Sequence, residues 1–260
     1  MDVLPKSGFC SKLGPDDENP PASSKDDAMT ITKSLEGDGK TLMASVYDRL
    51  RADIVDGVRR PGAKLRFDEL KETYGVGLSP LREALTRLAA EKLVVLEEHK
   101  GFRVAPISRS DLHDLLFMRQ EVEMLGIRRS IERGDDQWEA AIVAAIHALG
   151  KRVNLTPDGH IDPEWELRHR AFHDSLVAAC GSPRLLLLRA QLTDHADRYR
   201  RLSHYYHSAG RDHLSEHVAL SEAVVSRQAE LAERLIRAHL ARTVEIILSC
   251  EDLQGDGFDD

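Results

Sequence analysis

Histidine is the residue type whose abundance and spacing first suggest chemistry in this chain. The chain has 12 histidines, and most of them lie in its second half. His169 and His173 are four residues apart, so on a helix both rings share one face and can bind one metal ion. His217 and His239 lie in later segments with helical periodicity. Because the same spacing arises by chance among solvent-exposed histidines, the residues alone leave metal binding open.

A second group of residues has the spacing expected of a DNA-reading helix. Gly75 and Gly77 allow a tight turn, and Ser79-Pro80 is typical of a helix start, with serine as the N-cap and proline as the first helical residue. Arg82 then lies one turn into the helix, where a recognition helix meets base edges or phosphates. The same spacing also fits a winged helix that docks proteins, so this alternative stays open.

The elements that must position this helix are predicted on both sides of it. Apolar residues at a helical period predict a first helix from Leu42 to Ile54, which ends before Pro61-Gly62, and a second over Phe67–Tyr74. After the DNA-reading helix, two β-type runs flank a basic turn at His99–Gly101 and predict a hairpin whose tip can approach DNA closely. This is the element order of a winged helix-turn-helix, expected over residues 40–106. The predicted DNA-contacting residues are Arg66 (the weakest candidate), Ser79, Pro80, Arg82, His99, Lys100 and Gly101.

The remaining sequence predicts one helical domain and two disordered ends. From Ser110 to about Ser249 the pattern is purely helical, which predicts an all-helical antiparallel bundle over residues 110–250 and a mainly α chain. Residues 1–39 and 251–260 have little apolar periodicity, so disorder is expected for both. Breaks between helices are expected near Gly134-Asp135, Asn154–Gly159, Gly181–Pro183 and Ser208–Gly210.

Composition limits the classes of function. The chain has a formal net charge of −8, but residues 40–107 hold 13 basic and 10 acidic side chains, a local charge of +3 that leaves −11 elsewhere. A basic module on an acidic body suits specific DNA binding by a small part of the chain. Three widely spaced cysteines, no signal peptide and no apolar run of about 20 residues predict a cytoplasmic protein that does not enter a membrane.

The motifs argue against an enzyme. The sequence lacks the two Glu-x-x-His pairs of di-iron helical bundles, and it also lacks His-Glu-x-x-His, a Gly-rich phosphate loop and a nucleophile-elbow serine. The alternative to a DNA-binding regulator is a metal-dependent helical-bundle enzyme fused to a winged-helix docking module. In that case the imidazoles would hold a metal ion that activates water.

The DNA-reading segment resembles the signature of GntR-family transcription regulators. Val76–Leu85 reads VGLSPLREAL here, where the family form is Val-Ser-Arg-Thr-Pro-Val-Arg-Glu-Ala-Leu, and Gly101–Val104 also matches the family's wing. The resemblance implies that Ser79, Arg82 and Gly101 contact DNA. Leu78 stands where the family usually has arginine, so one base or phosphate contact is in doubt.

The helical domain resembles the FCD-type sensor domain of the FadR branch of this family. Phe172-His173 matches the family's Phe-His pair, and His217 and His239 match its two later histidines. His169 stands where aspartate or asparagine is usual, so a metal bound by four imidazoles would be Zn²⁺ or Ni²⁺ rather than Mg²⁺ or Mn²⁺. The same departure also fits a domain that has lost its metal and whose histidines bind an anionic effector directly.

The resemblance also implies a carboxylate effector. Arg119, four residues before Glu123, matches an arginine of the family's first sensor helix and would hold a carboxylate; a surface ion pair is the alternative. Arg198 and Arg200 are weaker effector candidates. Several segments, including GDDQWEAAI and FHDSLVAACGS, resemble the CsiR group, which senses glutarate. The expected protein is a homodimeric repressor that binds a pseudo-palindromic operator and is released by a small carboxylate such as a dicarboxylate.

Overall fold

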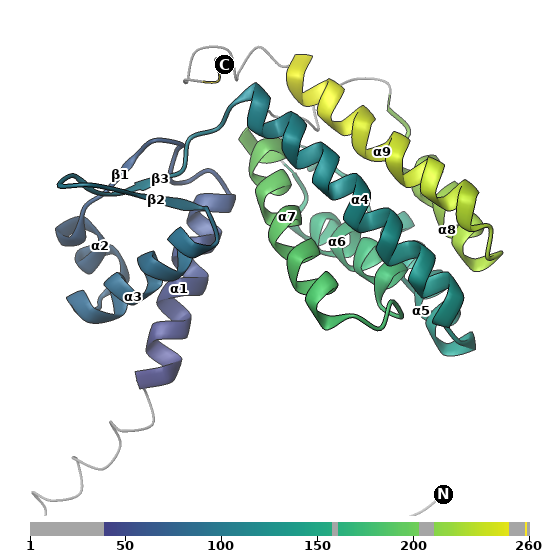
Figure 1. Ribbon diagram of the computed structural model, residues 1–260, viewed down its shortest axis with the longest axis horizontal. Helices are drawn as coiled ribbons and strands as arrows, with labels where there is room; N and C mark the ends of the chain where they lie inside the picture. Colours follow the sequence, from purple (N-terminus) through teal and green to yellow (C-terminus); the bar gives the residue numbers. More distant parts are fainter. Residues whose placement is uncertain (1–38, 158–160, 203–210, 250–257, 259–260) are drawn as a thin grey trace, which may run out of the picture. The chain divides into compact units, whose positions relative to one another are not determined.

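The computed structural model describes residues 39–157, 161–202, 211–249 and 258, and Figure 1 shows how their helices and strands are arranged. The disorder expected for 1–39 lies outside the described residues, except that Gly39 begins the first helix. Of the expected tail, only Phe258 is described, and its ring packs against Tyr199 at a centroid distance of 6.2 Å. Among the described residues, no helix is both long and apolar enough to cross a membrane.

The first part of the described chain is a winged helix-turn-helix. The strands form an antiparallel sheet in the order β1-β3-β2, in which Leu65 is paired with Phe102 and Val94 with Val104. One face of each helix supplies a core that includes Leu50, Ile54, Leu70, Leu81 and Leu85. The elements are α1 (Gly39–Val55), β1 (Lys64–Leu65), α2 (Phe67–Tyr74), α3 (Leu78–Ala90), β2 (Val94–Glu97) and β3 (Gly101–Val104).

Two of the glycines with positive φ in this domain flank the DNA-reading elements. Gly75 follows α2 with φ 67°, and Gly101 begins β3 with φ 85°, both in the left-handed region that glycine adopts without strain. The predicted start of α3 is wrong by two residues: Gly77 is the N-cap and Leu78 the first helical residue, so Ser79 is not the cap. Pro80 still fits, because the first turn of a helix does not use its backbone N–H groups.

The second part of the described chain is entirely helical apart from an isolated bridge between Leu155 and Ile161. Helix α4 packs against α9 and α7, α5 against α6, and α8 against α9, as the teal, green and yellow helices in Figure 1 show. The Trp138 indole of α5 donates a hydrogen bond to the Ser175 carbonyl of α6, at 2.8 Å. The helices are α4 (Arg109–Arg133), α5 (Asp136–Gly150), α6 (Pro163–Val177), α7 (Pro183–Leu202), α8 (His213–Val225) and α9 (Ala229–Ser249).

Side-chain caps define the first residues of α6 and α8, the helices that carry three of the predicted metal ligands. Asp162 caps α6 by accepting from the Trp165 backbone N–H, and Asp212 caps α8 by accepting from that of Ser215.

The mainly α fold and most of its breaks are confirmed. The breaks at Gly134-Asp135 and Gly181–Pro183 separate helices as predicted, whereas the break at Ser208–Gly210 lies outside the described residues. Helices α8 and α9 are separated by a turn in which Arg227 has φ 56° and which contains no glycine or proline.

Candidate functional site

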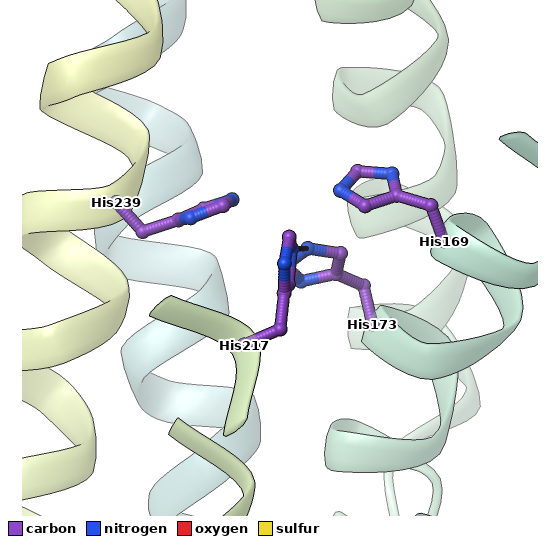
Figure 2. A group of neighbouring side chains, drawn as sticks. All are labelled: His169, His173, His217 and His239. Atoms are coloured by element: carbon purple, nitrogen blue, oxygen red, sulfur yellow. Dashed lines mark hydrogen bonds between the residues drawn. The ribbon is translucent and has the colours of Figure 1, made fainter. Parts of the chain in front are cut away.

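Four histidine side chains converge inside the helical domain, as Figure 2 shows. His169 and His173 come from successive turns of α6, His217 from α8 and His239 from α9. One ring nitrogen from each lies within 4.8 Å of the others. The set is the one predicted from the sequence, and the rings are largely shielded from solvent.

Hydrogen bonds outside the cluster decide which ring nitrogens face its centre. The Nδ1 atom of His217 lies 2.5 Å from the His213 carbonyl oxygen, and because a carbonyl only accepts, Nδ1 carries the hydrogen. The Nε2 atom of His217 therefore has a free lone pair, and it lies 3.1 Å from Nε2 of His173. Two nitrogens at this distance either share one hydrogen or bind one cation, so the donor set fits a metal ion chemically.

The protonation of the cluster also suits a cation. Burial, reinforced by the neighbouring histidines, holds the pKa of His169, His173 and His217 well below the ordinary value of 6.5. Burial also lowers the pKa of His239, although its hydrogen bond with Glu216 opposes the shift. All four rings are therefore neutral at pH 7, which is the form of histidine that binds metals.

Glu216 and Arg211 lie behind His239. The Glu216 carboxylate is 2.8 Å from Nδ1 of His239 and accepts two hydrogen bonds from the Arg211 guanidinium, at 2.8 and 2.5 Å. Burial raises the pKa of Glu216, but the hydrogen bonds from His239 and Arg211 outweigh burial and bring this pKa well below its ordinary value. Glu216 is therefore ionised at neutral pH.

A polar cavity adjoins the histidines and contains many arginines. Its lining includes His169, His173 and His239 of the cluster together with Arg119, Arg170, Arg189, Thr193, Asp197, Arg200 and Thr243. Three of its four arginines have close carboxylate partners: Arg170 lies 2.9 Å from Asp194, Arg189 lies 2.9 Å from Glu123, and Arg200 contacts Asp197. The cavity is thus a concave, cation-rich space next to a group of neutral imidazoles.

Arg119 is the arginine of this cavity that is least compensated. Its guanidinium is 3.8 Å from Glu123, which is the partner of Arg189, and its Nε atom has no hydrogen-bond partner among the described residues. Burial lowers the pKa of Arg119 to about 10, although Glu123 opposes the shift. The surface ion pair considered for Arg119 and Glu123 is wrong, because their side chains are only 16% and 2% exposed.

The two other predicted effector residues lie in different places. Arg200 lines the cavity, whereas Arg198 bonds the Ala105 carbonyl and lines a separate space with Lys92, Asp111 and His195. Residues two apart on a helix point to different sides, which accounts for the separation. The sequence analysis does not identify Arg170, Arg189, Arg211 or Glu216. Arg170 and Arg189 have partners distant in sequence, and Arg211 and Glu216, although five residues apart, meet His239 more than 20 residues later. The position of Glu216 beside His217 is the local signal.

The predicted DNA-contacting residues lie on α3, before α2 and on the wing. Ser79 and Arg82 are exposed on α3, and the Arg82 guanidinium lies 6.0 Å from the centre of the Phe67 ring. Phe67 in turn meets the edge of Phe102 in β3, at a centroid distance of 6.2 Å. Two aromatic rings thus bring the starts of α2 and α3 and the wing together.

The remaining DNA candidates are accessible. Arg66 is exposed as the N-cap residue of α2, with its guanidinium 3.9 Å from Glu69. His99 and Lys100 are exposed at the wing turn. Leu78, the departure from the family signature, is an exposed leucine at the start of α3, with 43% of its surface accessible.

A winged helix followed by a separate helical domain is the architecture of a DNA-binding transcription regulator. The model described as bacterial regulatory proteins, gntR family, matches residues 42–104, and the FCD domain model matches residues 114–242. The HTH-type transcriptional repressor GlaR of Escherichia coli (strain K12) is 39% identical over 223 residues, which cover 84% of this chain and 97% of GlaR. This chain belongs to the GntR family, in the FadR branch that carries an FCD domain.

Further relatives agree with this assignment. The uncharacterized HTH-type transcriptional regulator BphR of Paraburkholderia xenovorans (strain LB400) is 34% identical over 211 residues, covering 80% of this chain and 86% of BphR. The solved structure of E. coli McbR/YncC has the same fold, with a TM-score of 0.66, 21% identity and coverage of 80% of this chain and 97% of McbR. The predicted class, a DNA-binding regulator and not an enzyme, is confirmed, and the metal-dependent enzyme is set aside.

Proposed function

We propose that this protein is a transcriptional repressor whose affinity for its operator is controlled by a small carboxylate bound in the cavity beside the histidine cluster. The observation that carries the proposal is the buried and incompletely paired Arg119 at a cavity with three further arginines. A guanidinium binds a carboxylate through two parallel hydrogen bonds, and it does so most strongly where water is excluded. A repressor is favoured because GlaR is named as one.

The histidine cluster is proposed to hold a divalent transition metal. His169, His173, His217 and His239 would be its ligands, and four neutral nitrogen donors favour Zn²⁺ or Ni²⁺ over cations that prefer oxygen. When bound, such an ion would add a positive Lewis-acidic centre at the end of the cavity. Arg119 and Arg200 of the chain attract the effector, and the surrounding helices exclude water from it.

The effector is proposed to be a dicarboxylate, glutarate being the first to test. Cationic side chains line the cavity from different elements, Arg119 from α4 and Arg200 from α7, so two anionic groups of one short molecule can each find a partner. The resemblance of several segments to the glutarate-sensing CsiR group supports the same choice.

DNA reading is proposed to depend on α3 and the wing. Ser79, Pro80, Arg82 and Gly101 would contact the operator, with Arg66, His99 and Lys100 at its phosphates. A homodimer would present two such surfaces to a pseudo-palindromic site in the cytoplasm. The effector shifts the equilibrium only if it prefers the state that binds DNA poorly.

Selection of bound genomic fragments followed by titration of the selected operator tests this proposal. Arg82→Ala should weaken operator binding by about 5- to 150-fold at fixed salt, because one base or phosphate contact of a charged group is worth about 1–3 kcal/mol. Arg234→Ala, which removes one exposed charge from α9, is the matched control and should bind as the wild type does. Equal affinities of the wild type and Arg82→Ala would contradict the assignment of the reading helix.

A further inference from the structure

The Nδ1 atom of His239 lies between a hydrogen-bond acceptor, the Glu216 carboxylate, and a hydrogen-bond donor, the Arg211 guanidinium. Nδ1 of His239 is 2.8 Å from a carboxylate oxygen of Glu216 and 3.1 Å from the Nη2 atom of Arg211. A carboxylate only accepts hydrogen bonds and a guanidinium only donates them. Glu216 therefore requires a hydrogen on Nδ1, whereas Arg211 requires a lone pair there.

This choice decides what His239 offers to the cluster. With the hydrogen on Nδ1, the neutral ring presents the lone pair of Nε2 to the other three histidines. With the hydrogen on Nε2, the ring presents an N–H group, which cannot bind a metal ion. In the same position, the His239 ring can therefore bind a metal ion in its Nδ1–H tautomer but not in its Nε2–H tautomer.

The surrounding contacts favour Glu216. Arg211 already donates from Nε to one Glu216 oxygen at 2.8 Å, from Nη1 to the Thr243 hydroxyl at 3.0 Å, and from Nη2 to the other Glu216 oxygen at 2.5 Å. Nη2 also reaches the backbone carbonyl of His239 at 3.1 Å, which occupies its second hydrogen. Arg211 thus holds the carboxylate in place without a hydrogen left for Nδ1.

We propose that Glu216, held by Arg211, is a positioning residue that fixes the metal-binding tautomer of His239. The proposal rests on the proposed metal centre. The Glu216 carboxylate lies one hydrogen bond outside the four proposed ligands, 2.8 Å from Nδ1 of His239. Partners of this kind orient a ligating histidine and raise its basicity.

The test compares metal affinity and tautomer in three proteins of full length. Zn²⁺ dissociation constants are measured by competition with a chromophoric chelator for the wild type, Glu216→Gln and Glu222→Gln. Glu222 is an exposed glutamate on the same helix and controls for the loss of one charge. Glu216→Gln should bind Zn²⁺ about 10- to 100-fold more weakly, the usual cost of removing such a partner, and Glu222→Gln should match the wild type.

Histidine tautomers are read in the metal-free proteins by two-bond ¹H–¹⁵N correlation with ¹⁵N-labelled histidine, the His239 signal being assigned by its loss in His239→Phe. His239 should carry its hydrogen on Nδ1 in the wild type and shift toward the Nε2–H form in Glu216→Gln. A merely structural glutamate would not produce this change. Unchanged Zn²⁺ affinity or an unchanged tautomer in Glu216→Gln overturns the role of Glu216 alone. A wild type that binds no Zn²⁺ overturns the metal centre as well, and leaves DNA binding untouched.

Discussion

Replacing Arg119 with methionine should weaken carboxylate binding without weakening the fold. The side chain of Arg119 is 16% exposed, and within the described part of the chain its ion pair is a loose 3.8 Å contact with Glu123. Glu123 keeps its closer partner, Arg189, at 2.9 Å in the variant. Because Glu123 keeps this partner and methionine removes the cost of burying one guanidinium, the free energy of unfolding should stay the same or rise.

The loss of affinity follows from the bond that methionine cannot make. A hydrogen bond from a charged donor contributes about 1.5–3 kcal/mol, which corresponds to a Kd about 10- to 150-fold higher. Isothermal titration of the wild type and Arg119→Met with glutarate measures this change. Urea unfolding without glutarate measures the stability of each protein.

Arg189→Met is the matched control, because it removes the close partner of the same carboxylate. It leaves Glu123, whose side chain is 2% exposed, with only the more distant Arg119. The free energy of unfolding should then fall by about 3–5 kcal/mol, since a buried charge loses its partner. Glutarate binding by Arg119→Met equal to that of the wild type would contradict the role of Arg119 as a carboxylate ligand. A loss of stability as large as that of Arg189→Met would contradict its weak compensation by Glu123.

Three further predictions concern stability and DNA binding. The metal-free protein should lose stability as pH falls below about 6.5. The cluster histidines have lower pKa values in the folded than in the unfolded chain, so protonation favours unfolding. A thermal unfolding midpoint that is equal at pH 7 and pH 5 would contradict this. Leu78→Arg restores the family's residue at an exposed position of α3 and should tighten operator binding. If the new arginine contacts a phosphate, the slope of log affinity against log salt concentration should steepen by about one unit, and an unchanged slope argues against that contact. Gly126→Ala should lower the free energy of unfolding by about 1–3 kcal/mol, because a Cβ atom there would lie 2.9 Å from a methyl group of Val177, and chemical denaturation would show whether α4 can shift to absorb it.

The fold could be predicted where a local rule is strong. Helix α2 is predicted with its observed bounds because an apolar period and Gly75 mark it, whereas α3 begins two residues earlier than expected because Gly77, and not Ser79, is its N-cap. Strand β1 was missed. It is only two residues long, Lys64–Leu65, and is defined by its pairing with β3, so no alternation along the chain could reveal it.

The candidate site could be predicted only in part, for a similar reason. The four histidines are found by residue type and by their match to the family pattern, and the structure brings them together. The residues that set their chemistry are not found this way: Glu123 meets Arg189 across 66 positions and Glu216 meets His239 across 23. Such contacts depend on how α4, α7, α8 and α9 pack, and charged residues are too common for the sequence to select them.

The charges around the cavity indicate that metal occupancy should change which anion the protein prefers. Without metal, the four imidazoles are neutral, Arg119 is the cavity arginine with the weakest compensation, and Arg200 already contacts Asp197, so the second carboxylate of a dicarboxylate gains less binding energy than the first. A divalent ion on the histidines would add two positive charges beside the same cavity and would make binding of the second carboxylate more favourable. The ratio of glutarate affinity to butyrate affinity should therefore rise when the metal-free protein is loaded with Zn²⁺. A ratio that stays constant would show that the histidines and Arg119 do not act on the same ligand.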